Sequence, residues 1–299
     1  MYDSESALKI SQFRHREFLL FLAKLTLSSI AFILGAVIGG MIVTFMGLQS
    51  PPMPEGVDSS QAFLTLMLES PLLVLPLILI GRGLGGGTLS RAATLSFFTW
   101  TVYTLNTAIE TQAFTTMSTE GALFTTLSFL PPAILCGTAV AWLFRPAEEG
   151  MGSMVLVKEY FSSHKAGAWI WRLALAALIF VPIYLAFGSL VAPLTSEYFQ
   201  ENMFGLRMPS QEEIFTVLLI RSILFLLACL PVITLWQRSR LCLFLNLGTA
   251  LFVLVGFLYM LSATYMPLAV RVPHTLEILA DSFAHAGLLV LLLGKRHLK

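Results

Sequence analysis

The sequence predicts an all-α protein that crosses a lipid bilayer eight times. Hydrophobic residues make up 57% of the 299-residue chain and charged residues only 12%, whereas a soluble domain carries about 25% charged residues. A helix needs about 20 mostly apolar residues to cross a bilayer. Eight segments meet this requirement: residues 20–46, 61–81, 92–112, 121–144, 169–192, 213–236, 241–262 and 274–294. We therefore expect a polytopic membrane protein whose main partner is the lipid bilayer.

The connections between these spans are mostly short and rich in Pro, Gly, Ser or Asp. Residues 81–87 have the glycine content of a phosphate-binding loop, but they follow a membrane span rather than a strand and lack the Gly-Lys-Ser/Thr ending. We interpret them as an inner turn. Prolines in the second span (Pro71, Pro76) and in the fourth (Pro131, Pro132) are predicted to kink or unwind those helices.

The basic residues predict the orientation of the chain. With the N-terminus in the cytoplasm, the inner segments hold fifteen of the 18 Lys and Arg residues. Only Arg207 and Arg271 fall in outer loops, and Arg221 lies within a span. This asymmetry follows the positive-inside rule, and an even number of spans then places both termini in the cytoplasm. The compact spans and the short loops without soluble domains favour a bacterial inner membrane. The net charge of +1 offers no concentrated basic face for nucleic acid.

The two halves of the chain resemble each other, which predicts a repeat of four plus four spans. Residues 24–32 resemble residues 172–180, and residues 63–70 resemble residues 215–222. Ser90-Arg91 and Ser239-Arg240 are both expected to open a third span of their half. Four spans return the chain to its starting side, so the halves would be parallel. The expected organisation is a cytoplasmic segment 1–19, membrane halves 20–145 and 169–294, a cytoplasmic linker 146–168 and a basic cytoplasmic tail 295–299.

The last span carries a stripe of ionisable side chains. At about 100° per residue, His274, Glu277, Asp281 and His285 fall within roughly 80° of one another on a helix. Ionisable groups at membrane depth are costly and mark ion or proton pathways. Three interpretations stay open: a proton or cation relay, a divalent metal site, and a polar seam against neighbouring helices. No HExxH or other strong metal motif is present, so we predict no cofactor and keep divalent metal as an alternative.

Other polar groups sit in the same outer half of the membrane. Glu69 and Arg221 occupy matching positions of the two halves, and they are candidates for a gate or substrate anchor or, alternatively, a structural ion pair. Tyr103, Asn106 and Glu110 share one face of the third span, where they would line a cavity or form a structural seam. We expect a polar cavity that opens to the extracytoplasmic side.

These observations favour a transporter or permease of a small solute or ion. One alternative is a membrane-embedded enzyme that acts on a lipid-linked or extracytoplasmic substrate through an acid–base or metal centre on the last span. Another is a non-catalytic subunit of a membrane complex. The cysteines Cys136, Cys229 and Cys242 lie singly in apolar segments and are interpreted as small core residues.

Overall fold

The computed structural model describes residues 4–53, 57–146 and 151–295; the side chains of residues 4–14 are excepted. Within these ranges the chain is helical, and its β-structure consists of two isolated bridges. The basic tail 295–299, apart from Lys295, and residues 147–150 of the linker lie outside the described residues. The predicted all-α class is confirmed for this part of the chain.

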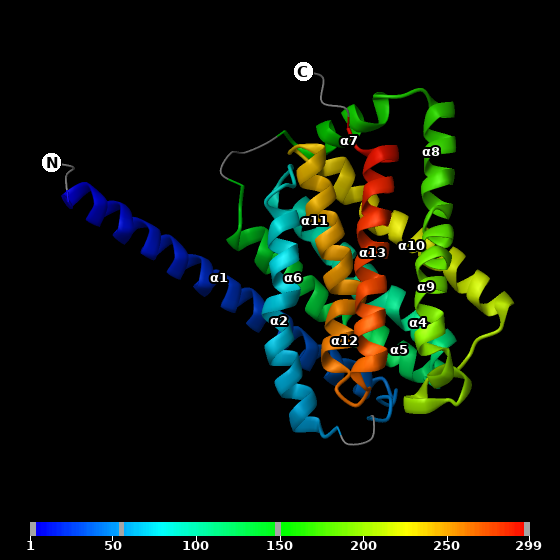
Figure 1. Cartoon of the computed structure of the whole chain (residues 1–299). Helices are drawn as coiled ribbons and strands as arrows, with labels where there is room; N and C mark the ends of the chain where they lie inside the picture. Colours follow the sequence, from blue (N-terminus) through cyan, green and yellow to red (C-terminus); the bar gives the residue numbers. More distant parts are fainter. Residues whose placement is uncertain (1–3, 54–56, 147–150, 296–299) are drawn as a thin grey trace.

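Most of the long helices run along the bundle, while α1 crosses it diagonally and α7 lies at one end (Figure 1). Their bounds are α1 Ser4–Phe45, α2 Ser59–Gly81, α3 Thr88–Thr99, η1 Trp100–Leu105, α4 Asn106–Phe114, α5 Thr119–Ser128, α6 Leu130–Leu143, α7 Ser153–Ser162, α8 Ala166–Leu178, α9 Phe180–Gln200, η2 Met203–Gly205, α10 Gln211–Leu235, α11 Arg240–Phe252, η3 Val253–Phe257, α12 Leu258–Ser262 and α13 Leu268–Leu293. The elements η1 and η3 are π-helical turns.

Seven helical segments of the described chain are long and apolar enough to cross a membrane. They are His15–Phe45, Ser59–Gly81, Thr119–Leu143, Ala166–Gln200, Gln211–Leu235, Arg240–Ser262 and Leu268–Leu293. Each corresponds to a predicted span, although the helix around the first begins well before residue 20 and the last begins before residue 274. Large apolar side chains such as Leu68 and Leu190 point outward, more than 70% exposed, as expected of a surface in contact with lipid.

The predicted third span, residues 92–112, is not among these seven. The chain there runs through α3, η1 and α4, and this segment from Thr88 to Phe114 contains seven threonines as well as Arg91 and Glu110. This segment packs against α6 and α10, and most of its side chains are buried. Because neighbouring helices cover it, its polar residues do not face lipid, which explains its lower apolar content.

The prolines act differently in the two spans. The fourth span divides into α5 and α6 at Phe129, just before Pro131 and Pro132. This is expected because the proline ring clashes with the preceding helical turn and proline has no backbone N–H to donate. In contrast, α2 continues through Pro71 and Pro76 without an interruption.

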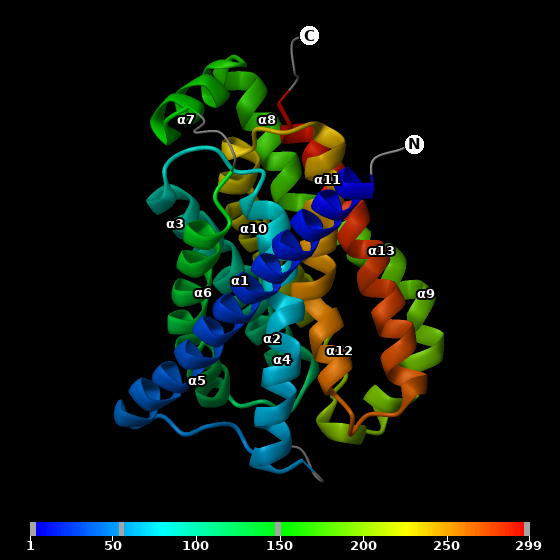
Figure 2. The same ribbon diagram turned by 90° about the vertical axis from the view of Figure 1, so that its left-hand side faces the viewer.

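Small residues allow α1 to cross the bundle at close range. Gly35 faces the backbone of Pro132, and a Cβ atom on Gly39 would lie 1.8 Å from the backbone oxygen of Ser128. Such Gly-x-x-x-Gly spacing lets helix backbones touch in a membrane. As a result, α1 lies diagonally across α2 and α6 (Figure 2).

Different backbone hydrogen bonds join the chain segments at the two ends of the bundle. At the end that carries α7, which we call the α7 end, the Gly85 N–H donates to the Leu235 carbonyl at 2.8 Å and the Gln237 N–H donates to the Gly83 carbonyl at 2.9 Å. Gly83 is required there, because a Cβ atom would lie 2.2 Å from the Trp236 ring. Ser239 caps α11, whereas Ser90 lies in the first turn of α3, which begins after Gly87.

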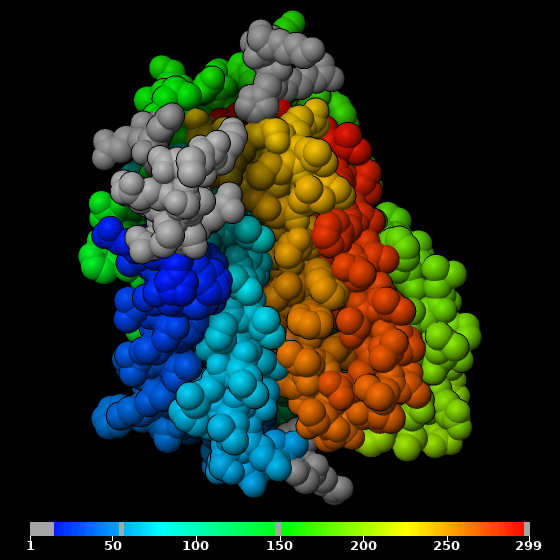
Figure 3. All heavy atoms as spheres, turned by 60° about the vertical axis from the view of Figure 1, so that its left-hand side comes forward, coloured from blue at the N-terminus to red at the C-terminus, as the bar shows by residue number. Residues whose placement is uncertain are grey.

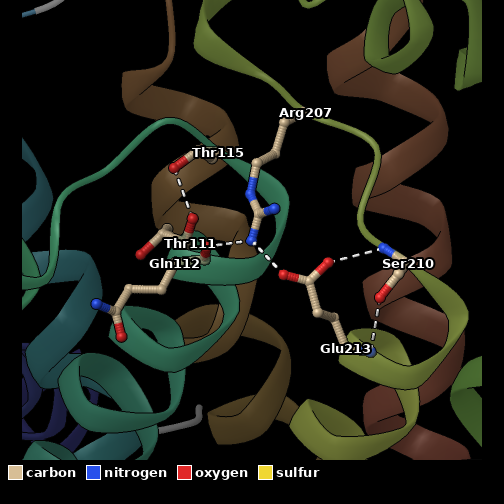
Figure 4. A network of polar contacts seen from close by, with 6 residues as sticks. All are labelled: Thr111, Gln112, Thr115, Arg207, Ser210 and Glu213. Carbon is tan, nitrogen blue, oxygen red and sulfur yellow. Dashed lines mark hydrogen bonds and ion pairs between the residues drawn. The ribbon is translucent and has the colours of Figure 1, made fainter.

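At the opposite end, which we call the loop end, the segment before α10 joins the segment after α4. The Thr116 N–H donates to Gly205 at 2.8 Å and the Arg207 N–H donates to Phe114 at 2.9 Å. The Arg207 guanidinium donates to the Gln112 carbonyl and to the Glu213 carboxylate, both at 3.0 Å (Figure 4). Glu213 also accepts from the Ser210 N–H, completing a capping box at the start of α10.

Candidate functional site

A cavity of about 750 Å³ lies inside the half of the bundle that ends at the loop end. Its walls come from α2, η1, α4, α9, α10, α11, η3, α12 and α13, and loop residues such as Val57, Leu206 and Met266 also line it. Several of these helices lie side by side on one face of the molecule, in the order α2, α11–α12, α13 and α9 (Figure 3). Most of the lining side chains are apolar or aromatic. The cavity is within the size range of small-molecule sites.

Eight of the nine site residues singled out in the sequence line this cavity: Glu69, Tyr103, Glu110, Arg221, His274, Glu277, Asp281 and His285. The ninth, Asn106, is fully buried and does not line the cavity, but it accepts a hydrogen bond from Arg221. The polar stripe of α13 therefore meets the polar face of η1 and α4 across one space.

Arg221 is the cationic centre of the site and is 1% exposed. Its Nε donates to Asn106 Oδ1 at 2.9 Å, and its Nη1 forms an ion pair with Glu110. The guanidinium also lies 5.3 to 5.8 Å from the ring centroids of Phe180, Tyr184 and Phe225, within the range of cation–π attraction. A buried arginine is stable only with such partners.

Glu69 is not the partner of Arg221, although the matching positions of the two residues suggested an ion pair. The acid that pairs with Arg221 comes from α4, which packs against α10, whereas α2 packs mainly against α1, α6 and α11. Glu69 is instead near Ser262 and the rings of Tyr103 and Tyr259. Its Oε1 atom is buried and accepts no hydrogen bond.

The α13 stripe contains one hydrogen-bonded pair and two groups without hydrogen bonds. His274 Nδ1 and Glu277 Oε2 are 2.8 Å apart. One turn further in, Asp281 Oδ1 has no hydrogen-bond partner, and neither has Nε2 of His285. The His285 ring packs at 5.2 and 5.3 Å against Phe180 and Phe225. The two deeper residues thus lie between an apolar wall and the open cavity.

The cavity has an excess of acidic groups. Four carboxyls, from Glu69, Glu110, Glu277 and Asp281, face one guanidinium. Glu110 pairs with the guanidinium and Glu277 is hydrogen-bonded to His274, whereas within the described residues neither Glu69 nor Asp281 has a salt bridge. A buried carboxylate without a counterion is costly, so such a group takes up a proton or binds a cation. No three His, Cys, Asp or Glu residues of the described ranges are close enough to hold a metal ion together.

Sequence reasoning did not identify the aromatic part of the site. Tyr103 and Tyr259 stack with ring centroids 5.4 Å apart, and the Tyr259 hydroxyl donates to the Tyr103 carbonyl at 3.0 Å. These residues belong to η1 and α12, which are distant in sequence. Phe180, Tyr184 and Phe225 lie in apolar runs, where an aromatic residue carries no signal of its own.

Comparison with protein families, with characterised proteins and with solved structures finds no match for this chain.

Proposed function

We propose that this protein is a transporter or permease for a small solute. The observation that supports the proposal is a cavity of about 750 Å³ enclosed by membrane helices and lined by buried carboxyls without salt bridges. Transporter sites are built in this way, near the middle of a helical bundle and with polar groups on its inner face. A structural seam would instead satisfy its polar groups across the helix contacts.

The segment from Thr88 to Phe114 would be the eighth crossing. Its 27 residues extend about 40 Å at a rise of 1.5 Å per residue, which is enough to span a bilayer. With eight crossings, both termini lie on the same side. The distribution of Lys and Arg supports the cytoplasm as that side and a bacterial inner membrane as the location. The cavity would then open to the extracytoplasmic side through the loop end.

A parallel repeat of four plus four crossings is supported by contacts that the two halves exchange. A shift of 152 residues, which relates Glu69 to Arg221, also relates residues 83–85 to residues 235–237. The Gly85–Leu235 and Gln237–Gly83 hydrogen bonds are converted into each other by this shift, as expected for contacts across a pseudo-twofold axis. The π-helical turns η1 and η3 occupy the third crossing of each half and contact each other.

Asp281 and His285 are the proposed proton-carrying groups, and Glu69 and Arg221 the anchors for the solute. Asp281 lies close enough to Arg221 for their charges to interact, so a change in the contacts of Arg221 alters the charge balance at Asp281. A solute that enters the cavity would compete with protons for the same carboxyls.

The test is accumulation of solutes in proteoliposomes under a pH gradient. Amino acids, sugars, nucleosides, carboxylates and organic cations would be offered as a defined panel and quantified by mass spectrometry. The parent is expected to accumulate at least one compound, and the Asp281→Asn/His285→Ala variant to lose the accumulation. Glu212→Gln, which changes an exposed acid outside the cavity, serves as the control. A double variant that matches the parent for every compound would overturn the proposal.

A further inference from the structure

We propose that the cavity binds an amphipathic organic cation and releases protons from Glu69 and Asp281 as the cation enters. The inference rests on the proposed function and names the substrate class of that same site. It depends on three features of the cavity: the sign of its charge, the unused hydrogen-bonding capacity of two buried carboxyls, and the aromatic character of its walls.

The charge of the site selects a cation. The ionisable groups that face the cavity are Glu69 from α2, Glu110 from α4, Arg221 from α10, the four stripe residues of α13, and the phenols of Tyr103, Tyr184, Tyr259 and Tyr265. The guanidinium is already paired with Glu110 and hydrogen-bonded to Asn106. An anionic solute would therefore meet three further carboxyls and no free guanidinium, whereas a cation would reduce the repulsion among them.

The buried carboxyls supply the contacts. Glu69 is 8% exposed and Asp281 is 6% exposed, and each has one oxygen atom that is buried without a hydrogen-bond partner. Both residues line the cavity. A positively charged group that contacts either carboxylate would satisfy its buried oxygen, as ion pairing does for buried acids in general.

The remaining wall distinguishes an organic cation from a bare metal ion. An inorganic cation requires several oxygen or nitrogen ligands around it, and no three His, Cys, Asp or Glu side chains of the described residues are close enough to supply them together. The wall instead offers the Tyr103–Tyr259 stack near Glu69 and the ring of Tyr184 near Asp281. Aromatic faces attract organic cations, and a volume of about 750 Å³ accommodates a ligand of several rings.

Protons provide the counter-movement. In the empty cavity, the two carboxyls carry protons because an ionised carboxylate is costly in apolar surroundings. For each positive charge that enters, the carboxyl in contact with it releases one proton to the solution on the loop-end side and becomes the counterion. When the cation leaves, the carboxyl takes up a proton again. One proton released per positive charge keeps the charge of the cavity the same in both states, and the cycle exchanges cations for protons.

The experiment measures binding of tetraphenylphosphonium to the detergent-purified full chain, with protein-free micelles as the blank. Calorimetry in two buffers of different ionisation enthalpy gives the number of protons released. We expect saturable binding, release of at least one proton, and an affinity that rises about tenfold per pH unit for each proton released. Tetraphenylborate has the same shape with the opposite charge, and we expect it to bind at least about 100-fold more weakly.

Variants assign the protons to residues. Glu69→Gln and Asp281→Asn should each lower the number of released protons and weaken tetraphenylphosphonium binding about tenfold or more, while Glu212→Gln should behave as the parent. Thermal melting of each variant verifies that it is folded, and the comparison of the two tetraphenyl ions needs no variant at all. Equal binding of the two ions, or cation binding without proton release, overturns the inference.

The panel of solutes separates this inference from the proposed function. If the parent accumulates a neutral or anionic solute but does not bind tetraphenylphosphonium, the substrate class is wrong and the transport function stands. If the parent neither accumulates any compound nor binds the cation, both proposals are wrong.

Discussion

The ion pair between Arg221 and Glu110 leads to a quantitative prediction for stability. Arg221 is almost fully buried, while the Glu110 side chain is 25% exposed. Removal of one partner from a buried pair costs about 3–5 kcal/mol because it leaves an uncompensated charge. An exposed pair contributes at most about 1 kcal/mol. The partial exposure of Glu110 places the interaction between these limits, so we expect a coupling energy of about 2 kcal/mol.

A double-mutant cycle isolates this coupling. The variants are Arg221→Met, Glu110→Gln and their combination, and the free energy of unfolding is measured in detergent by a reversible denaturation assay. Arg221→Met alone should cost about 3 kcal/mol or more, because it also removes the hydrogen bond to Asn106 and the contacts with three aromatic rings. In the combined variant the loss should be about 2 kcal/mol smaller than the sum of the single losses.

A second cycle provides the control. Arg221→Met combined with Glu69→Gln should be additive within about 0.5 kcal/mol, because these residues form no ion pair. A larger coupling of Arg221 with Glu69 than with Glu110 would refute the assignment and would restore the partner suggested by their matching positions in the two halves.

Three further perturbations follow from the packing and from one helix cap. Gly39→Ala should destabilise the fold by about 1–3 kcal/mol, because its Cβ atom would meet the Ser128 carbonyl, whereas Gly40→Ala, which has open space, should be neutral or slightly stabilising in the same melting assay. Gly83→Ala should destabilise the α7 end to a similar degree through its clash with Trp236, while Gly167→Ala, with no neighbour within 4 Å, should not; equal melting temperatures for these two variants would contradict the close approach. At the loop end, hydrogen bonds from the Ser60 hydroxyl and the Gln61 N–H hold the pKa of the Asp58 carboxyl below its ordinary value of 3.8. A lowered pKa stabilises the folded state above the unfolded pKa, and this contribution is lost as the pH falls through the folded pKa. The difference in melting temperature between the parent and Asp58→Asn should therefore be constant near neutral pH and shrink below pH 3.8, and a difference that grows on acidification would contradict the cap.

The sequence was sufficient for features that depend on local spacing. Long apolar segments predicted the seven helices that are able to cross a membrane, and the spacing of His274, Glu277, Asp281 and His285 predicted that they share one face of a helix. All four line the same cavity. The third predicted span is helical, but it is not among the seven helices selected by length and apolar composition. That α6 and α10 pack against it could not be predicted from its residues.

Contacts between distant segments could not be predicted in this way. The pairing of Arg221 with Glu110 rather than Glu69 depends on which helices are neighbours, and apolar spans of similar composition do not encode their neighbours in any single residue. The Tyr103–Tyr259 stack has the same origin, since it depends on the contact between η1 and the segment of η3 and α12. The helix α1 begins at Ser4, well before the predicted first span at residue 20. Its first residues are polar, so a search for apolar spans does not detect them, although such residues can still form a helix.

In the proposed function, protons and a solute share the carboxyls of the cavity. The most direct measurement records the internal pH of proteoliposomes, with a trapped fluorescent pH indicator, while the compound that the parent accumulates is added outside. We expect a change in internal pH that saturates with solute concentration. This change should be retained in Glu212→Gln and lost in Asp281→Asn. Undiminished accumulation of the solute by Asp281→Asn, or accumulation by the parent without any change in internal pH, would contradict it.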